Sequence, residues 1–129
     1  MELPENLETL FDDASGDVAI GDLAAAAEKF QQITVAAPDH FDGWHAFAMT
    51  LMKLGRYPEA IEAGLSAVRL QPQDQLAWSS LSLFYVRDHR IKQAEAAGAK
   101  ARILSWGGQI KDPEQAIQDI LALQDEATT

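Results

Sequence analysis

The feature that most limits what this chain can fold into is an internal repeat with a period of 34 residues. At that offset, residues 44–70 align with residues 78–104 and share seven identical positions. The identical pairs are Trp44 and Trp78, Arg56 and Arg90, Ala60 and Ala94, Ala63 and Ala97, Gly64 and Gly98, Ala67 and Ala101, and Leu70 and Leu104. A weaker unit precedes them, with Gly21, Ala26 and Pro38 at the places of identical residues in the middle unit. A fixed period of this length predicts supersecondary units that stack on one another around one continuous core.

The apolar residues within each unit have the spacing of helices and not of strands. Trp44, Phe47, Ala48 and Leu51 stand at positions i, i+3, i+4 and i+7, and the residues that follow Trp78 repeat this pattern. The pattern predicts helices over about residues 42–54 and 76–87. A second apolar run follows in each unit, over residues 60–68 in the middle one, and proline closes it there. Each unit is therefore expected to be a helix, a tight turn and a second helix.

The turns between the paired helices need residues that tolerate a left-handed backbone. Gly21 and Gly55 supply this freedom in the first two units, and His89 stands at the equivalent position in the third. We therefore interpret His89 as a turn residue and not as a ligand. Small residues are expected where the two helices of a unit touch, because they let the backbones approach closely. The matched pairs are Ala14 with Ala26, Ala48 with Ala60, and Ser82 with Ala94.

These units resemble the tetratricopeptide repeat, which has the same length, a leading Trp, a small residue, a turn glycine, an alanine and a closing proline. The middle unit carries this pattern in Trp44, Ala48, Gly55, Ala60 and Pro72. The resemblance implies an all-α fold, a right-handed α-solenoid of three repeats at about residues 7–38, 41–72 and 75–106, in one domain. The third unit departs from the pattern with Trp106 at the closing proline. The first has Leu10 for the leading aromatic and Asp13 and Asp17 at expected core positions.

A last helix is predicted after the repeats, over about residues 113–125. Asp112 is its expected N-cap, Pro113 its first residue, and Gln115 the third position of a capping box. Its apolar face comprises Ala116, Ile117, Ile120, Leu121 and Leu123. This face suits a capping helix that shields the open end of the stack. The alternative is insertion into a groove of its own chain or of another chain.

Composition and motifs exclude several classes of function. Twenty acidic and ten basic residues give a net charge of −10, which argues against a nucleic-acid partner. No apolar run is long enough for membrane insertion, so a cytoplasmic location is expected. The sequence has no cysteine and no motif of a nucleophile, a phosphate loop or a metalloprotease, so neither an enzyme nor a cofactor is expected. Asp39, His40, Asp42 and His45 could surround a metal ion, but the preferred interpretation is a helix N-cap with solvated neighbours, and no metal site is assigned.

The resemblance implies that the first helices of successive units line a concave groove, which binds an extended peptide or a helix of a partner protein. Carried onto this sequence, the face opposite the Trp44 seam has an apolar floor with polar edges. The residues assigned to this partner-binding groove are Asp42, His45, Met49, Met52, Lys53, Leu76, Ser79, Leu83, Val86 and Arg87, with Ala46 and Ser80 between them. Flexible methionines suit an apolar or amphipathic ligand. The alternative is that these residues pack among themselves or under the last helix.

One subgroup of the family binds the acidic C-terminal tails of heat-shock chaperones through a clamp of lysine, asparagine and arginine side chains. Here the corresponding positions are occupied by Phe11, Ser15, Ala46, Leu76 and Ser80. The clamp is missing, so this co-chaperone role is not expected.

The sequence therefore predicts a non-enzymatic protein-binding module, a scaffold or adaptor whose protein or peptide partner it does not identify. Two alternatives stay open. One is a chaperone for apolar export substrates, because small acidic proteins with three such repeats have that role. The other is a self-assembling scaffold, because residues 1–40 contain nine acids and one base, whereas residues 73–105 contain three acids and five bases. Copies could then form a homo-oligomer by head-to-tail contact of oppositely charged ends.

Overall fold

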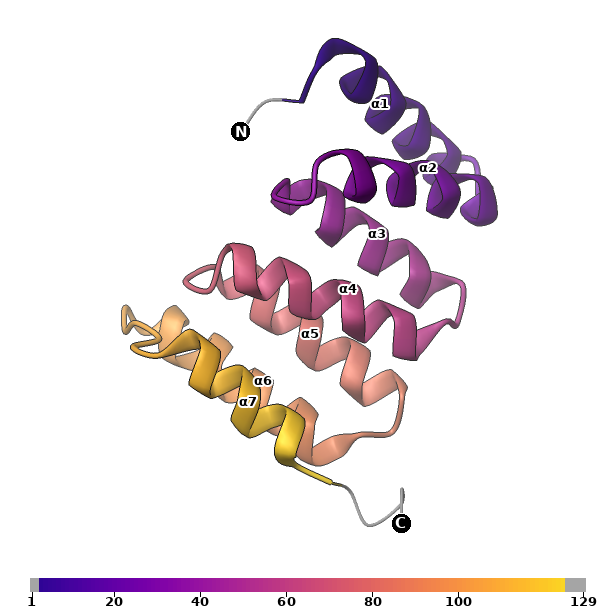
Figure 1. Cartoon of the computed structure of the whole chain (residues 1–129). Helices are drawn as coiled ribbons and strands as arrows, with labels where there is room; N and C mark the ends of the chain where they lie inside the picture. Colours follow the sequence, from indigo (N-terminus) through magenta and orange to yellow (C-terminus); the bar gives the residue numbers. More distant parts are fainter. Residues whose placement is uncertain (1–2, 125–129) are drawn as a thin grey trace.

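The computed structural model describes residues 3–124, and these residues form seven α-helices and no strand. The helices are α1 (Glu5–Ala19), α2 (Leu23–Ala36), α3 (Phe41–Lys53), α4 (Tyr57–Leu70), α5 (Gln75–Arg87), α6 (Ile91–Ser105) and α7 (Pro113–Ala122). The first six follow one another down the stack in chain order (Figure 1). The predicted helices 42–54 and 76–87 are observed one residue earlier at each start, as α3 and α5.

The helices form an α-solenoid of paired layers. Within each pair, α1 packs on α2, α3 on α4 and α5 on α6, and the pairs are joined by packing of α2 on α3 and α4 on α5. The first helices α3 and α5 also contact each other directly, whereas the second helices make no comparable contact among the described residues. By this contact α3 and α5 share one side of the stack, which we call the inner layer, and α2, α4 and α6 share the other side, the outer layer.

The three intra-pair turns have the backbone that the sequence predicts. Gly21 and Gly55 have φ angles of 84° and 78°, and His89 has a φ angle of 60°. His89 is thus confirmed as a turn residue. Gly107 repeats this conformation with a φ of 83° directly after α6, which ends that helix.

The predicted small residues do lie where paired helices meet. Ala14, Ala26, Ala48 and Ala60 are completely buried. In the third pair, the Ser82 hydroxyl donates a hydrogen bond of 2.7 Å to the carbonyl oxygen of Ala94. The backbones of α5 and α6 therefore approach closely enough for a side chain of one helix to reach the main chain of the other.

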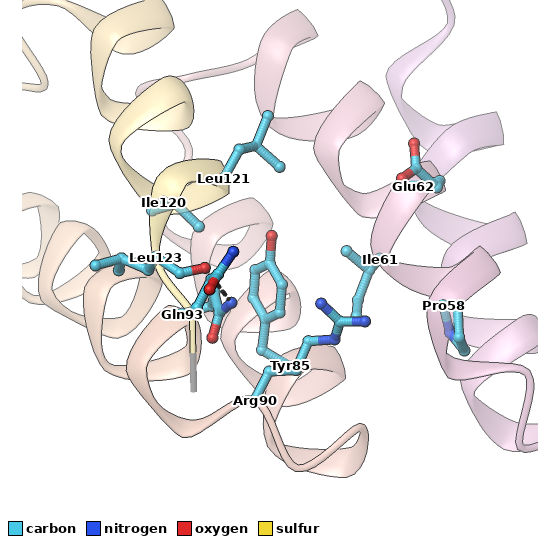
Figure 2. Close-up of a pocket in the computed structure, with 10 residues that line it drawn as sticks. Pro58, Ile61, Glu62, Tyr85, Arg90, Gln93, Ile120, Leu121 and Leu123 are labelled. Atoms are coloured by element: carbon cyan, nitrogen blue, oxygen red, sulfur yellow. Dashed lines mark hydrogen bonds between the residues drawn. The ribbon is translucent and has the colours of Figure 1, made fainter. Parts of the chain in front are cut away.

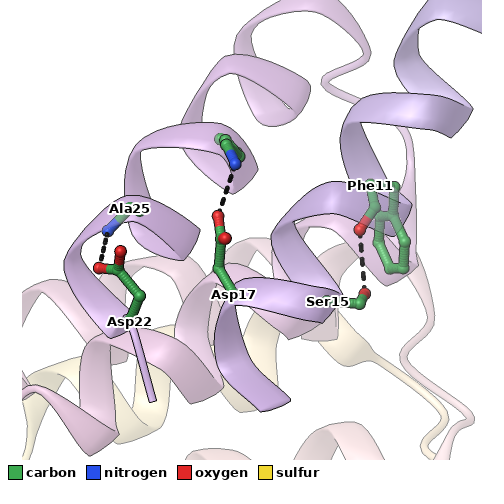
Figure 3. A network of polar contacts seen from close by, with 6 residues as sticks. Phe11, Ser15, Asp17, Asp22 and Ala25 are labelled. Atoms are coloured by element: carbon green, nitrogen blue, oxygen red, sulfur yellow. Dashed lines mark hydrogen bonds and ion pairs between the residues drawn. The ribbon is translucent and has the colours of Figure 1, made fainter. Parts of the chain in front are cut away.

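The first pair has a small core of its own and a polar contact beside it. Phe11 and Phe30 pack edge to face with ring centroids 5.3 Å apart, next to buried Ala14. Asp17 stands at an expected core position of this unit, and its carboxylate lies 2.6 Å from the Lys29 ammonium of α2 (Figure 3). This ion pair holds α1 on α2 at a position where the other units use apolar contacts.

Two glycines in the middle of α4 and α6 have different surroundings. An added Cβ at Gly64 would lie 3.0 Å from two ring carbons of Phe84 and 3.4 Å from Leu81. The stacking of one unit on the next predicts Trp78 as the neighbour of Gly64, but the Phe84 ring of α5 occupies this space. The same stacking predicts Trp106 or the last helix beside Gly98. The nearest atoms there belong instead to Ser82 and Arg102.

The last helix is present, and its position decides between the two alternatives for it. Asp112 accepts a hydrogen bond of 3.1 Å from the Gln115 N–H, which confirms the N-cap, and the helix ends at Ala122; residue 125 lies outside the described residues. The helix α7 packs back on α6 and α4 of its own chain. Residues of α5 and α6 alone line a shallow cavity of about 280 Å³ at the far end of the stack. The helix thus fills a groove of its own chain and leaves the end face open.

Candidate functional site

The inner face of α3 and α5 contains most of the residues that the sequence assigns to a partner-binding groove. Leu76 and Val86 of α5 are 56% and 45% exposed, and they are two of seven large apolar side chains with this degree of exposure among the described residues. The half-buried members are His45, Ala46, Met49, Met52 and Leu83, and the exposed polar members are Asp42, Lys53, Ser79 and Arg87. Ser80 is buried and does not line the surface. We call the patch formed by Met49, Met52, Leu76, Leu83 and Val86 the inner apolar patch.

The 34-residue repeat explains how this patch arises. Leu83 and Val86 of α5 are the repeat equivalents of Met49 and Met52 of α3, so the four side chains form two rows on the inner layer. Both methionines also pack against the main core, so their outer atoms alone are available to a ligand. Lys53 and Arg87 stand at equivalent C-terminal positions of the two helices and give one edge of the patch a positive charge.

A polar contact joins the two inner helices beside this patch. Nε2 of His45 lies 2.9 Å from the Ser80 hydroxyl, and the His45 ring stacks on Phe41 with centroids 5.7 Å apart. Burial lowers the pKa of His45 below its ordinary value, while the charges of Asp74 and Asp42 oppose that shift. His45 is therefore a neutral hydrogen-bonding side chain at neutral pH, which fixes α3 against α5.

Because burial lowers the pKa of His45, acidification should destabilise the fold. The unfolded chain binds a proton at the ordinary histidine pKa of 6.5, whereas the folded chain resists protonation until a lower pH. The contribution of this group to the free energy of unfolding is thus complete above pH 6.5 and is lost as the pH falls below that value. The variant His45→Gln keeps a hydrogen-bonding side chain without the titration. Urea unfolding between about pH 7.5 and 5.5 should show a flatter pH dependence for this variant; parallel curves would contradict the assignment.

The second histidine near this surface has a structural role. Nδ1 of His40 accepts a hydrogen bond of 3.0 Å from the Gly43 N–H, so His40 is the N-cap of α3. This confirms the N-cap interpretation of the local cluster of His and Asp residues. Within residues 3–124, no three histidine or acidic side chains converge as metal ligands. None of the described helices has the length and apolar character that crossing a bilayer requires.

The stacked helix pairs define an α-solenoid. A tetratricopeptide repeat family model matches residues 12–75 and, one repeat later, residues 45–108. The chain therefore belongs to the tetratricopeptide repeat family, and this confirms the resemblance inferred from its sequence. No curated protein matches the chain in sequence.

Three solved structures illustrate the similarity of the fold. A structure of MamA is 23% identical with a TM-score of 0.75, over 81% of this chain and 62% of the MamA chain. The CopN–Scc3 complex gives 17% identity and a TM-score of 0.78, over 95% of this chain and 71% of the other. The Sgt2 TPR domain from Aspergillus fumigatus gives 19% identity and a TM-score of 0.74, over 92% of this chain and 78% of the Sgt2 chain. At these identities the comparisons establish the fold, and the chain spans less than two thirds of the MamA length.

Sequence reasoning missed two features of this region. The first is the contact between His45 and Ser80, which joins neighbouring repeats and therefore has no signal in the periodicity within one repeat. The second is a pair of equivalent grooves on the outer layer, one of which α7 occupies. The 34-residue period contained a signal for these grooves, because it places matching residues on α2, α4 and α6.

Proposed function

We propose that this protein is a non-enzymatic interaction module that binds a peptide or helix of a partner protein on the inner apolar patch. The family and the fold support the general role, since tetratricopeptide repeat proteins are generally interaction modules. One observation carries the choice of surface, namely the exposure of Leu76 and Val86 on the inner layer. Exposed apolar patches of this kind mark interaction sites more often than isolated exposed residues do.

The chemistry of the patch indicates what its ligand is like. Met49, Met52 and Leu83 offer flexible apolar contacts, which adapt to leucine-like or aromatic side chains of a partner. Lys53 and Arg87 flank one end and favour acidic groups next to the apolar residues of the ligand. The ligand is therefore an apolar or amphipathic segment with acidic residues at one end.

The variant Leu76→Glu/Val86→Glu should lose the partner without losing the fold. Both side chains are half-exposed, so glutamate is tolerated in the free protein, but a bound ligand would bury its charge. Tagged wild-type and variant protein are compared in pull-downs from the native source, with mass spectrometry and with circular dichroism as the check on folding. A partner captured by the wild type should be reduced at least about ten-fold in the variant.

The matched control places the same charges on exposed apolar residues elsewhere. Ile91→Glu/Trp106→Glu changes side chains that are 48% and 79% exposed and lie at the two ends of α6, outside the inner layer. This control should keep the partner. Equal capture by both double variants would overturn the proposed surface, and no captured protein from the native source would overturn the proposed role.

A further inference from the structure

The starting point is the groove of its own chain that α7 fills. Ile117 and Ile120 of α7 are buried against the main core, and the helix lies between α4 and α6 on the outer layer. Figure 2 shows Ile120 and Leu121 of α7 facing Ile61 of α4 across the ring of Tyr85. A part of this groove with a volume of about 380 Å³ stays open beside α7. The groove is thus a surface on which this fold already binds an amphipathic helix.

Polar contacts fix α7 at both ends of its groove. The Gln73 side-chain amide donates to the Ile110 carbonyl and accepts from the Ile110 N–H, both at 2.8 Å. At the other end, Nε2 of Gln93 donates to the Leu123 carbonyl at 2.8 Å. Arg69 of α4 lies 3.5 Å from Glu114 of α7. Neutral amides and one cation therefore hold an acidic helix.

One repeat earlier, the outer layer has an equivalent groove on α2, bounded by Phe47 of α3 and by Arg56 at the N-cap of α4. It is a cavity of about 410 Å³ whose lining includes Ala24, Ala27, Glu28, Gln31, Phe47 and Arg56. Four of these residues stand 34 positions before residues that line the groove of α7, as Ala24 before Pro58, Ala27 before Ile61, Glu28 before Glu62, and Arg56 before Arg90. No helix of the described residues occupies this place, which we call the α2/α4 groove.

The polar residues around the α2/α4 groove differ from those that hold α7. By the repeat offset, Asp39 replaces Gln73, Glu59 replaces Gln93, and Val35 replaces Arg69. The guanidinium of Arg56 is already paired with Glu59 through two hydrogen bonds, and Glu28 has no ion-pair partner among residues 3–124. The groove therefore lacks an equivalent of the cation that binds Glu114 of α7, and its lining carries Glu28 as an acidic group that Arg56 does not pair with.

We propose that the α2/α4 groove binds an amphipathic helix of a partner protein that carries basic side chains beside its apolar face. Small Ala24 and Ala27 leave room for larger apolar side chains, and Phe47 supplies an apolar contact at the floor. The chain's own α7 does not fit, because it carries Glu114 and Asp119 and no basic residue. A second copy is therefore a poor occupant. This surface lies on the opposite layer from the inner apolar patch and adds a second binding site to the protein.

The test uses two synthetic peptides and the whole protein. One peptide has the sequence of residues 110–124, and the other has the same sequence with Glu114→Lys and Asp119→Lys. Both present the apolar face that the equivalent groove already accepts, and they differ in charge alone. Titration followed by amide chemical shifts in NMR should place the basic peptide on α2 and α4, with at least about ten-fold tighter binding than the acidic peptide.

Matched variants then separate this groove from the rest of the surface. Ala24→Trp fills the groove and Glu28→Lys reverses its charge, and both positions are exposed, so the fold is retained. Each should weaken binding of the basic peptide at least about five-fold, whereas Glu62→Lys, the same change at the equivalent position beside α7, should not. Equal binding of both peptides, an equal effect of Glu62→Lys, or shifts confined to α3 and α5 would overturn the proposal. The last result would indicate the inner apolar patch instead, so the two proposals fail separately.

Discussion

Replacing Trp78 by alanine is expected to lower the free energy of unfolding by about 3–5 kcal/mol, the largest effect of any single change in this chain. The Trp78 side chain is completely buried in the main core, in the same cluster as Ile117 and Ile120 of α7. Its indole N–H donates a hydrogen bond of 2.7 Å to the Pro72 carbonyl, which the truncation also removes. A loss of this size is a large part of the stability of a domain of this length.

The repeat provides the matched control for this prediction. Trp44 stands at the equivalent position and donates the same hydrogen bond, at 2.8 Å, to the Pro38 carbonyl, but its ring is only half-buried. Trp44→Ala should therefore cost less than half as much. Chemical denaturation followed by far-ultraviolet circular dichroism compares the two variants. Equal losses would contradict the assignment of Trp78 to the core that α7 completes.

Replacing Gly64 by leucine is expected to be the second most damaging change, with a loss of about 1–3 kcal/mol. A Cβ there already reaches 3.0 Å from the Phe84 ring, so a larger side chain must push α5 away from α4. Helix propensity alone predicts the opposite sign, because glycine in a helix costs about 1 kcal/mol relative to alanine. The contact with Phe84 therefore decides the outcome.

Gly16 of α1 supplies the contrast. It also lies inside a helix, but an added Cβ there meets nothing within 4 Å. Gly16→Ala should raise the free energy of unfolding by about 0.5–1 kcal/mol, through helix propensity. Thermal unfolding of the two variants should therefore shift in opposite directions. A gain in melting temperature for Gly64→Leu would mean that α4 and α5 do not pack as described.

Most of the fold could be predicted from the sequence because one period determines it. The 34-residue repeat, the turn residues and the small residues at Ala48 and Ala60 all depend on contacts within one unit, and each unit repeats them. Those elements are observed as expected. The contact of Gly64 with Phe84 could not be predicted, because the spacing within one repeat does not fix the rotation of the next helix against it.

The position of α7 could not be predicted from the sequence. The amphipathic pattern of Ala116, Ile117 and Ile120 shows that one face of this helix is buried, but not against which surface. The two possible surfaces are the end of the stack, whose cavity is lined mainly by polar residues of α5 and α6, and the outer groove, which includes Ile61. The choice depends on side-chain amides such as Gln73 and Gln93, which bind backbone groups far away in sequence and leave no periodic signal.

The sequence predicts only a part of the candidate site. The helical spacing and the family resemblance predict that Leu76, Leu83 and Val86 line the partner-binding groove, and this stays a prediction. The burial of Ser80 beneath His45 does not, because the two side chains belong to different repeats. The same limit applies to the α2/α4 groove, which is visible only once the groove of α7 is known.

The central claim, that a partner binds across α3 and α5, is tested most directly by hydrogen–deuterium exchange of the protein alone and with the partner that the wild-type chain captures. The account predicts slower exchange in Phe41–Lys53 and Gln75–Arg87 on binding, and no such change for Leu76→Glu/Val86→Glu. Protection confined to α2, α4 or α6, or protection that survives this double substitution, would contradict it.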